Sequence, residues 1–302
     1  MKNKQFIGMT ILILTAIIWG NGFVFQKVAA DLLDAYTFCG VRMTIAAVTV
    51  SIFTLILNKK KGGLFSDTEY DAETYRKNTI VGGFQCGFCI SVALIVQQIG
   101  MLYTTAGKAG FITALYIIFV PVAGAIFMRK KNTLIRWLAV FIGVAGLFIL
   151  CVDDELIFSK GDLIILCSSF AYCAHLLCCD YYSKRGNPLK ISAIQLMVSA
   201  AISWIAAFLL GSPSIESIKA AIIPIFYCGI VSSGFGYTFQ IIGQRYIDPV
   251  KATITLSMES VFAVLFGALL LNEHMTLRQI IGCCMMFFAI IIVQLPERRK
   301  MR

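Results

Sequence analysis

The chain has 302 residues, of which 59% are hydrophobic and only 14% are charged, and its formal net charge is +10. A soluble domain carries about 25% charged residues, so this composition excludes an ordinary water-soluble protein. It predicts an integral membrane protein instead.

Ten apolar segments follow one another along the chain. A bilayer core of about 30 Å requires about 20 apolar residues per helix, and backbone groups in lipid must be hydrogen-bonded within their own segment. The segments therefore predict ten transmembrane helices. Their ranges are Phe6–Val28, Ala35–Leu57, Thr79–Tyr103, Gly110–Phe127, Leu134–Val152, Gly161–Tyr182, Ile191–Leu210, Ala220–Tyr246, Ala252–Leu271 and Leu277–Gln294.

The basic residues predict the orientation of these spans. If the N-terminus is cytoplasmic, 20 of the 26 lysines and arginines lie in or next to cytoplasmic segments and five lie in or next to outer ones, while Arg42 alone lies well within a span. This distribution follows the positive-inside rule and predicts cytoplasmic N- and C-termini. The positive charge is thus explained by topology, with anionic lipid as a further partner, and no nucleic-acid partner is expected.

The chain also shows weak internal similarity. A shift of 143 residues pairs Gln97 with Gln240, Gly100 with Gly243 and Tyr103 with Tyr246, and a shift of 153 pairs Gly8 with Gly161 and Trp19 with Tyr172. We therefore expect two five-helix repeats, residues 1–152 and 153–302. Because five is odd, the second repeat enters the membrane in the opposite sense. Inverted repeats of this kind are typical of secondary transporters, whose solute site lies near the midplane between the repeats.

Several short patterns resemble the ten-span EamA-type members of the drug/metabolite transporter superfamily. The resemblance covers nearly the whole chain, although Ser260 stands where the family usually has a proline. It implies movement of small metabolites, often amino acids or related compounds, without ATP. The patterns are Trp19-Gly20-Asn21-Gly22-Phe23, Arg42, Ala109 to Leu115 with Pro121, Gly161-Asp162-Leu163, and Met258-Glu259-Ser260-Val261-Phe262-Ala263 followed by Leu271-Asn272-Glu273.

Two ionisable residues at membrane depth are the first candidates for a functional site. Such groups are costly in lipid and usually face the protein interior or a cavity. Glu259 is the acid predicted well inside a span, where it either carries a proton or a cation or joins its helix to a neighbour. Arg42 either binds a substrate carboxylate or extends to the outer surface. We expect the two charges in different halves of the membrane, without a direct salt bridge.

Uncharged polar and aromatic residues complete the candidate solute site. His175 is either a titrating group or a neutral hydrogen-bonded side chain, and Gln97 and Gln240 have either a structural role or form a two-fold site. Asn21 is considered for the same reason as these amides. Aromatic side chains can line a cavity and stack on an aromatic or cationic solute, or they can serve packing. The candidates of this kind are Trp19, Tyr116, Tyr172 and Tyr237.

Catalytic and metal-binding patterns are absent from the sequence. There is no G-x-x-x-x-G-K-[ST] phosphate-binding loop and no H-E-x-x-H pattern. Cys86 and Cys89 have no second cysteine pair beside them in the sequence, so they are interpreted as packing residues, and no metal or cofactor is expected.

The sequence therefore predicts an all-α secondary transporter that moves a small metabolite by alternating access. Protons are the candidate coupling ion, and the cell membrane is the expected location. Two alternatives remain at this point: a membrane-embedded ligand sensor or scaffold, and an intramembrane enzyme. The sequence does not indicate the oligomeric state.

Overall fold

The computed structural model describes residues 2–58, 70–127, 132–151, 159–271 and 276–294, and within these ranges the regular structure is helical throughout. An all-α membrane architecture is thereby confirmed. Nine helices of the described residues are long and apolar enough to cross a membrane, and one further apolar helix, Leu134–Leu150, is shorter. The elements are α1 (Lys2–Ala30), α2 (Ala35–Asn58), α3 (Ala72–Met101), α4 (Ala106–Thr113), α5 (Tyr116–Phe127), α6 (Leu134–Cys151), α7 (Lys160–Ser183), α8 (Pro188–Leu210), α9 (Ile215–Ala220), α10 (Ile222–Phe226), the π-helix η1 (Tyr227–Gly236), α11 (Tyr237–Gln244), α12 (Pro249–Leu256), α13 (Glu259–Leu271) and α14 (Leu277–Gln294).

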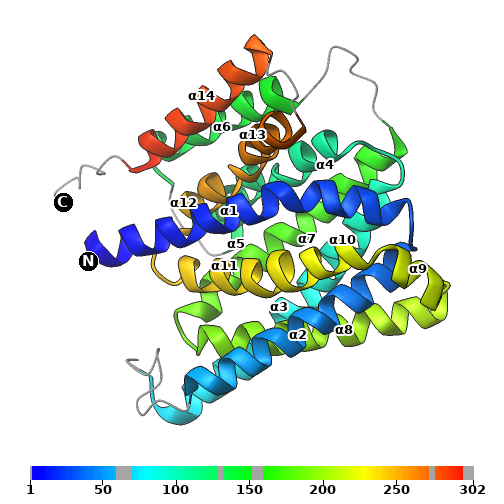
Figure 1. Cartoon of the computed structure of the whole chain (residues 1–302). Helices are drawn as coiled ribbons and strands as arrows, with labels where there is room; N and C mark the ends of the chain where they lie inside the picture. Colours follow the sequence, from blue (N-terminus) through cyan, green and yellow to red (C-terminus); the bar gives the residue numbers. More distant parts are fainter. Residues whose placement is uncertain (1, 59–69, 128–131, 152–158, 272–275, 295–302) are drawn as a thin grey trace.

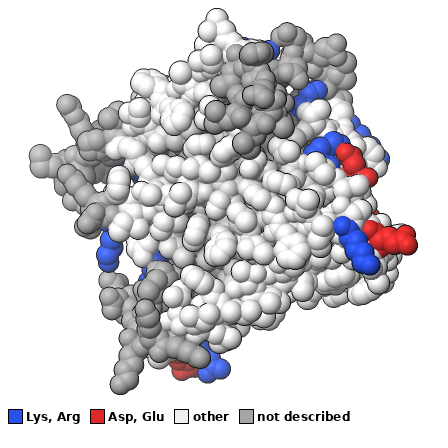
Figure 2. All heavy atoms as spheres, viewed as in Figure 1, with Lys and Arg blue, Asp and Glu red and all other residues white. Residues whose placement is uncertain are grey.

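The long helices run side by side in one bundle, and the start of α1 and the end of α14 lie at the same end of it (Figure 1). In the face shown in Figure 2, charged side chains gather toward the two ends of the helices, and a broad band between them carries none. A charge-free band flanked by charges matches a bilayer core between two aqueous faces.

Corresponding helices of the two predicted repeats begin with corresponding caps. Asp34 Oδ1 accepts hydrogen bonds from the backbone N–H groups of Tyr36 and Thr37 at the start of α2. Asn187 Oδ1 accepts them from Leu189 and Lys190 at the start of α8, at the same spacing along the chain. Short acceptor side chains at this position satisfy N–H groups that the first helical turn leaves unpaired.

Two predicted spans are interrupted, which corrects the expectation of continuous helices over Gly110–Phe127 and Ala252–Leu271. The first breaks at Ala114 and Leu115, between α4 and α5, and the second at Ser257 and Met258, between α12 and α13. Each break is a tightened turn in which the hydrogen bonds span three residues. The bonds are Leu115 N to Ile112 O, Ile117 N to Ala114 O, Met258 N to Thr255 O and Ser260 N to Ser257 O.

The eighth predicted span is continuous from Ile222 to Gln244 but widened in its middle. The ten residues of η1 form a π-helix between α10 and α11. A π-helix projects its side chains at a different angle from an α-helix and occurs often at functional sites. In this chain it places Ser232 and Ser233 toward α1 and α2, where both form the contacts described below.

Glycine pairs allow two helix pairs to approach closely. A Cβ added to Gly8 of α1 would lie 2.9 Å from the carbonyl oxygen of Gly243 in α11, and one added to Gly161 of α7 would lie 2.9 Å from that of Gly100 in α3. Small residues at helix contacts are the usual means of close packing in membranes. The contact between α1 and α11 and the contact between α3 and α7 therefore form at corresponding glycines of the two predicted repeats.

Candidate functional site

A central cavity lies where the broken helices, η1 and the long helices α1, α2, α3 and α7 meet. It contains about 350 Å³ of empty space, the part open to the outside included. Within it, about 30 Å³ can hold the centre of a water-sized sphere, which is room for about two water molecules. The residues that line it are Trp19, Phe23, Gln26, Arg42, Gln97, Thr113, Tyr116, Tyr172, Ser232, Tyr237 and Glu259.

Glu259 is the acidic residue of this cavity. It begins α13 immediately after the helix break, and only 3% of its surface is exposed. Tyr116 begins α5 immediately after the other break, and its hydroxyl donates a hydrogen bond to Glu259 Oε1 at 3.2 Å. The two residues are 143 residues apart. This separation equals one of the two shifts that relate the predicted repeats, so the pair joins positions that are equivalent in that prediction.

Arg42 is the basic residue of the cavity, and it is 1% exposed. Its Nε and Nη2 groups donate to Ser233 Oγ at 3.0 and 2.9 Å, and Nη1 donates to Gln26 Oε1 at 3.0 Å. The side chain therefore does not extend to the outer surface, which was one of the two alternatives for it. Arg42 and Glu259 line the same cavity, but among the described residues no ion pair forms between them.

A chain of hydrogen bonds connects the remaining polar residues of the cavity wall. Tyr172 donates from its hydroxyl to Gln97 Oε1 at 3.0 Å, and Gln97 Nε2 donates to Thr113 Oγ1 at 2.9 Å. The Tyr172 hydroxyl also lies 3.5 Å from that of Tyr237, whose ring packs against Trp19 with centroids 5.0 Å apart. Aromatic rings held in this way provide a rigid, partly apolar wall around the two charged residues.

Comparison with known proteins places this fold and cavity in a family. A family model described as the EamA-like transporter family matches residues 6–152 and, a second time, residues 159–295. The chain belongs to the EamA-like transporter family. An uncharacterized transporter of Archaeoglobus fulgidus is 28% identical, over 94% of this chain and 84% of that protein. The uncharacterized transporter YoaV of Bacillus subtilis is 25% identical, over 91% of this chain and 94% of that protein.

A solved structure shares the architecture of this EamA-like protein. A crystal structure of a protein that is 13% identical covers 95% of this chain, with a TM-score of 0.74, and 96% of its own chain is matched. At that identity the likeness shows the fold alone. The family, together with the apolar helices, identifies a multi-pass membrane transporter of the cell membrane that acts on a small-molecule solute.

Most of the residues singled out in the sequence come together at the cavity, and three do not. Those in the lining are Trp19, Arg42, Gln97, Tyr116, Tyr172, Tyr237 and Glu259. Asn21 is half-buried on α1, outside the lining. His175 is buried, and its Nε2 atom contacts Gln195 Oε1 at 3.0 Å and Cys179 Sγ at 3.4 Å.

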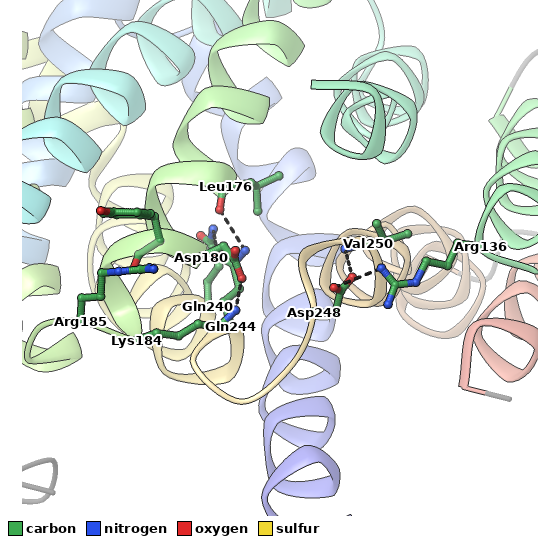
Figure 3. A network of polar contacts seen from close by, with 10 residues as sticks. Arg136, Leu176, Asp180, Lys184, Arg185, Gln240, Gln244, Asp248 and Val250 are labelled. Carbon is green, nitrogen blue, oxygen red and sulfur yellow. Dashed lines mark hydrogen bonds and ion pairs between the residues drawn. The ribbon is translucent and has the colours of Figure 1, made fainter. Parts of the chain in front are cut away.

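Gln240 belongs to a separate polar network between α7 and α11, toward the end of the bundle where α1 begins (Figure 3). Its Nε2 atom donates to Gln244 Oε1 at 3.1 Å, and Gln244 Nε2 donates to the carbonyl oxygen of Leu176 at 3.2 Å. The buried carboxylate of Asp180 pairs with Lys184 in the same region.

Four residues of the lining were not predicted as site residues: Phe23, Gln26, Thr113 and Ser232. Gln26 carries a signal that could have found it, because a glutamine in an apolar span needs a partner just as Gln97 does. Ser232 contributes through its backbone carbonyl, which accepts from Trp19 Nε1 at 3.0 Å. No side-chain pattern could reveal that contact.

In space, a second cysteine pair lies beside the pair of α3, which the spacing along the sequence did not reveal. Cys179 Sγ lies 3.7 Å from Cys86 Sγ, and Cys178 of α7 lies next to Cys89. Among the described residues no group of three or more histidine, cysteine, aspartate and glutamate side chains is arranged to hold a metal ion. The cysteines fit a packed contact between α3 and α7.

Proposed function

We propose that this EamA-like protein is a secondary transporter that moves a small zwitterionic metabolite, such as an amino acid, by alternating access. The observation that carries the proposal is the buried Glu259–Tyr116 pair, which joins the two helix breaks inside the central cavity. Broken helices at the midplane are typical of solute sites in transporters with inverted repeats.

The position of this pair suits a group that must serve both sides of the membrane. In the proposed inverted repeats, residues 1–152 and 153–302, Tyr116 and Glu259 occupy equivalent positions, so their hydrogen bond lies on the two-fold axis that relates the repeats. When the repeats exchange conformations, a group on that axis stays in place while its accessible side changes. We propose that Glu259 carries a proton in one direction and, once deprotonated, the ammonium group of the solute in the other, so that the proton gradient drives an exchange.

The two charged residues of the cavity match the two charges of a zwitterion. The hydrogen bonds of Arg42 to Ser233 and Gln26 leave one N–H on each Nη atom for a solute, and a guanidinium group binds carboxylates well. Glu259 Oε1 accepts from Tyr116, and its carboxylate is the acidic group that can receive an ammonium group. The rings of Trp19, Tyr172 and Tyr237 would enclose the apolar part of the solute.

The alternative functions make different demands on the site. A sensor would bind the solute in this cavity without moving it, and an intramembrane enzyme would need reactive groups at one membrane face. The hydrogen-bonded polar groups of this chain converge on a central cavity between the repeats, which favours transport.

Flux into sealed liposomes tests the proposal. Purified protein would be assayed with radiolabelled amino acids and nucleosides, with an inward proton gradient, with an outward one and with none, and compared with Glu259→Gln. Glu216→Gln, which removes an exposed acid from the short helix α9, is the matched control.

We expect gradient-driven accumulation of an amino acid in the wild type and the Glu216→Gln variant, and its loss in Glu259→Gln. Accumulation that survives in Glu259→Gln would reject the coupling role of Glu259 and leave transport in place. Binding of a solute without any flux would reject transport in favour of the sensor.

A further inference from the structure

Two aromatic–amide pairs occupy equivalent positions in the proposed repeats. Tyr172 corresponds to Trp19 and Gln97 corresponds to Gln240, at the shifts of 153 and 143 residues. The helices that carry them pack in the same register, through Gly161 and Gly100 in one case and Gly8 and Gly243 in the other. The Trp19–Gln240 pair could therefore form the contact that Tyr172 and Gln97 form.

The two pairs nevertheless differ in this structure. The Tyr172 hydroxyl donates to Gln97 Oε1 at 3.0 Å, whereas Trp19 Nε1 donates to the carbonyl oxygen of Ser232 at 3.0 Å. Ser232 lies beside Gly22, farther along α1 than Trp19, while Gln240 lies toward the contact between Gly8 and Gly243. The indole of Trp19 thus points away from its equivalent partner, and the ring of Tyr172 points toward its own.

Gln240 is left with an unused acceptor. Its side chain is fully buried, and its Oε1 atom has no hydrogen-bond partner among the described residues. The amide is oriented by its Nε2 atom, which donates to Gln244 in the network of Figure 3. A buried carbonyl oxygen without a donor destabilises the conformation that contains it. The equivalent atom, Gln97 Oε1, has a donor in Tyr172.

We infer that Gln240 is a solute-cavity residue of the opposite-facing state, in which Trp19 Nε1 leaves Ser232 O and donates to Gln240 Oε1. The inference rests on the proposed function, because it requires two states related by exchange of the repeats. In the same exchange Tyr172 releases Gln97. The exchange of the repeats maps Tyr116 onto Glu259 and Glu259 onto Tyr116, so their hydrogen bond is kept in both states. The coupling carboxylate thus stays fixed while the two aromatic side chains alternate as walls of the cavity.

Fluorine NMR of the protein labelled with 5-fluorotryptophan tests this inference without a solute. The chain has three tryptophans, and Trp137→Phe and Trp204→Phe assign the other two resonances. We expect two resonances for Trp19, one for each indole position. Gln240→Leu should decrease the second population about tenfold, the size of effect expected for one buried hydrogen bond. Gln97→Leu, which removes the equivalent acceptor, should increase it.

Ser199→Ala is the matched control, because it also removes a buried side-chain oxygen that has no hydrogen-bond partner among the described residues, but one on α8. It should leave the ratio of the two Trp19 resonances unchanged. A single Trp19 resonance in both the wild type and Gln97→Leu would overturn the inference, as would a ratio that Gln240→Leu does not change. Either result combined with normal flux in liposomes would reject the inference alone, whereas absence of flux would reject the proposed function.

Discussion

Gly20 lies where α1 crosses the break between α12 and α13, and its replacement by alanine tests the contact that supports Glu259. A Cβ at this position would lie 2.7 Å from the carbonyl oxygen of Glu259 and 2.9 Å from the backbone nitrogen of Ala263. Both neighbours are backbone atoms, so no side chain can move aside. Ordinary contacts begin at 3.4 Å, so α1 and the first turn of α13 must move apart by about 0.7 Å, the difference between 3.4 and 2.7 Å.

Such overpacking costs about 1–3 kcal/mol in the free energy of unfolding. The matched control is Gly124→Ala in α5, where an added Cβ would meet nothing within 4 Å and where alanine favours a helix by about 0.5–1 kcal/mol. We therefore expect Gly20→Ala to be less stable than Gly124→Ala by about 1–3 kcal/mol. Chemical unfolding in detergent micelles measures this difference.

Uptake should be more sensitive than stability to this substitution. The Tyr116–Glu259 hydrogen bond is already 3.2 Å long, and a shift of the Glu259 backbone would lengthen it. We expect Gly20→Ala to lose most of its gradient-driven uptake in liposomes, while Gly124→Ala retains it. Equal unfolding free energies and equal uptake in the two variants would refute the reasoning.

Two further substitutions test the anion-binding group and a helix cap. Arg42→Met should abolish binding of a carboxylate solute. It should also destabilise the protein by about 1–3 kcal/mol, because Ser233 and Gln26 lose their hydrogen-bond donor. Binding that survives in Arg42→Met would exclude Arg42 as the carboxylate ligand. At the start of α3, the backbone N–H of Thr74 donates to Asp71 and holds the pKa of that carboxyl below its usual value. The cap therefore contributes stability at neutral pH and loses it as the pH falls through the lowered pKa. Asp71→Ala should speed hydrogen exchange in the first turn of α3 at neutral pH, and the difference from wild type should vanish in acid.

The helices of this chain were predictable because hydropathy is a property of each segment by itself. Long apolar stretches must be helical in lipid, and the ranges predicted for α2, α8 and α14 agree with the structure within a few residues. The breaks between α4 and α5 and between α12 and α13 were not predicted. Neither contains proline or glycine at the turn itself, and Pro121 lies within α5 rather than at the break.

The candidate site was predictable only in part, for a related reason. Ionisable residues deep within the predicted spans are few, so Arg42 and Glu259 could be selected from the sequence alone, and the structure places both at the cavity. Which face of a helix a residue occupies depends on its neighbours. Gln240 therefore could not be distinguished from Gln97, although the two lie in different networks. The contact between Cys86 and Cys179 joins two helices that are far apart in the sequence, so spacing could not reveal it.

The proposed two-fold arrangement explains how a nearly symmetric scaffold can hold an asymmetric solute. On α1 and α7, equivalent positions carry ion pairs of exchanged sign, Lys27 with Asp31 and Asp180 with Lys184, so each pair remains neutral overall. Among the described residues that line the cavity, none of opposite charge in the same repeat balances the charge of Arg42 or of Glu259. Glu259 corresponds to Tyr116, and Arg42 corresponds at the shift of 153 to Gln195, so each proposed repeat contributes one charge and the other repeat has a neutral polar residue there. A strictly symmetric site would present the same group to both ends of a zwitterion. In the proposed site, Arg42 in one repeat and Glu259 in the other would give a zwitterionic solute a single preferred orientation, while the helices around it keep the two-fold relation that the proposed alternating access requires.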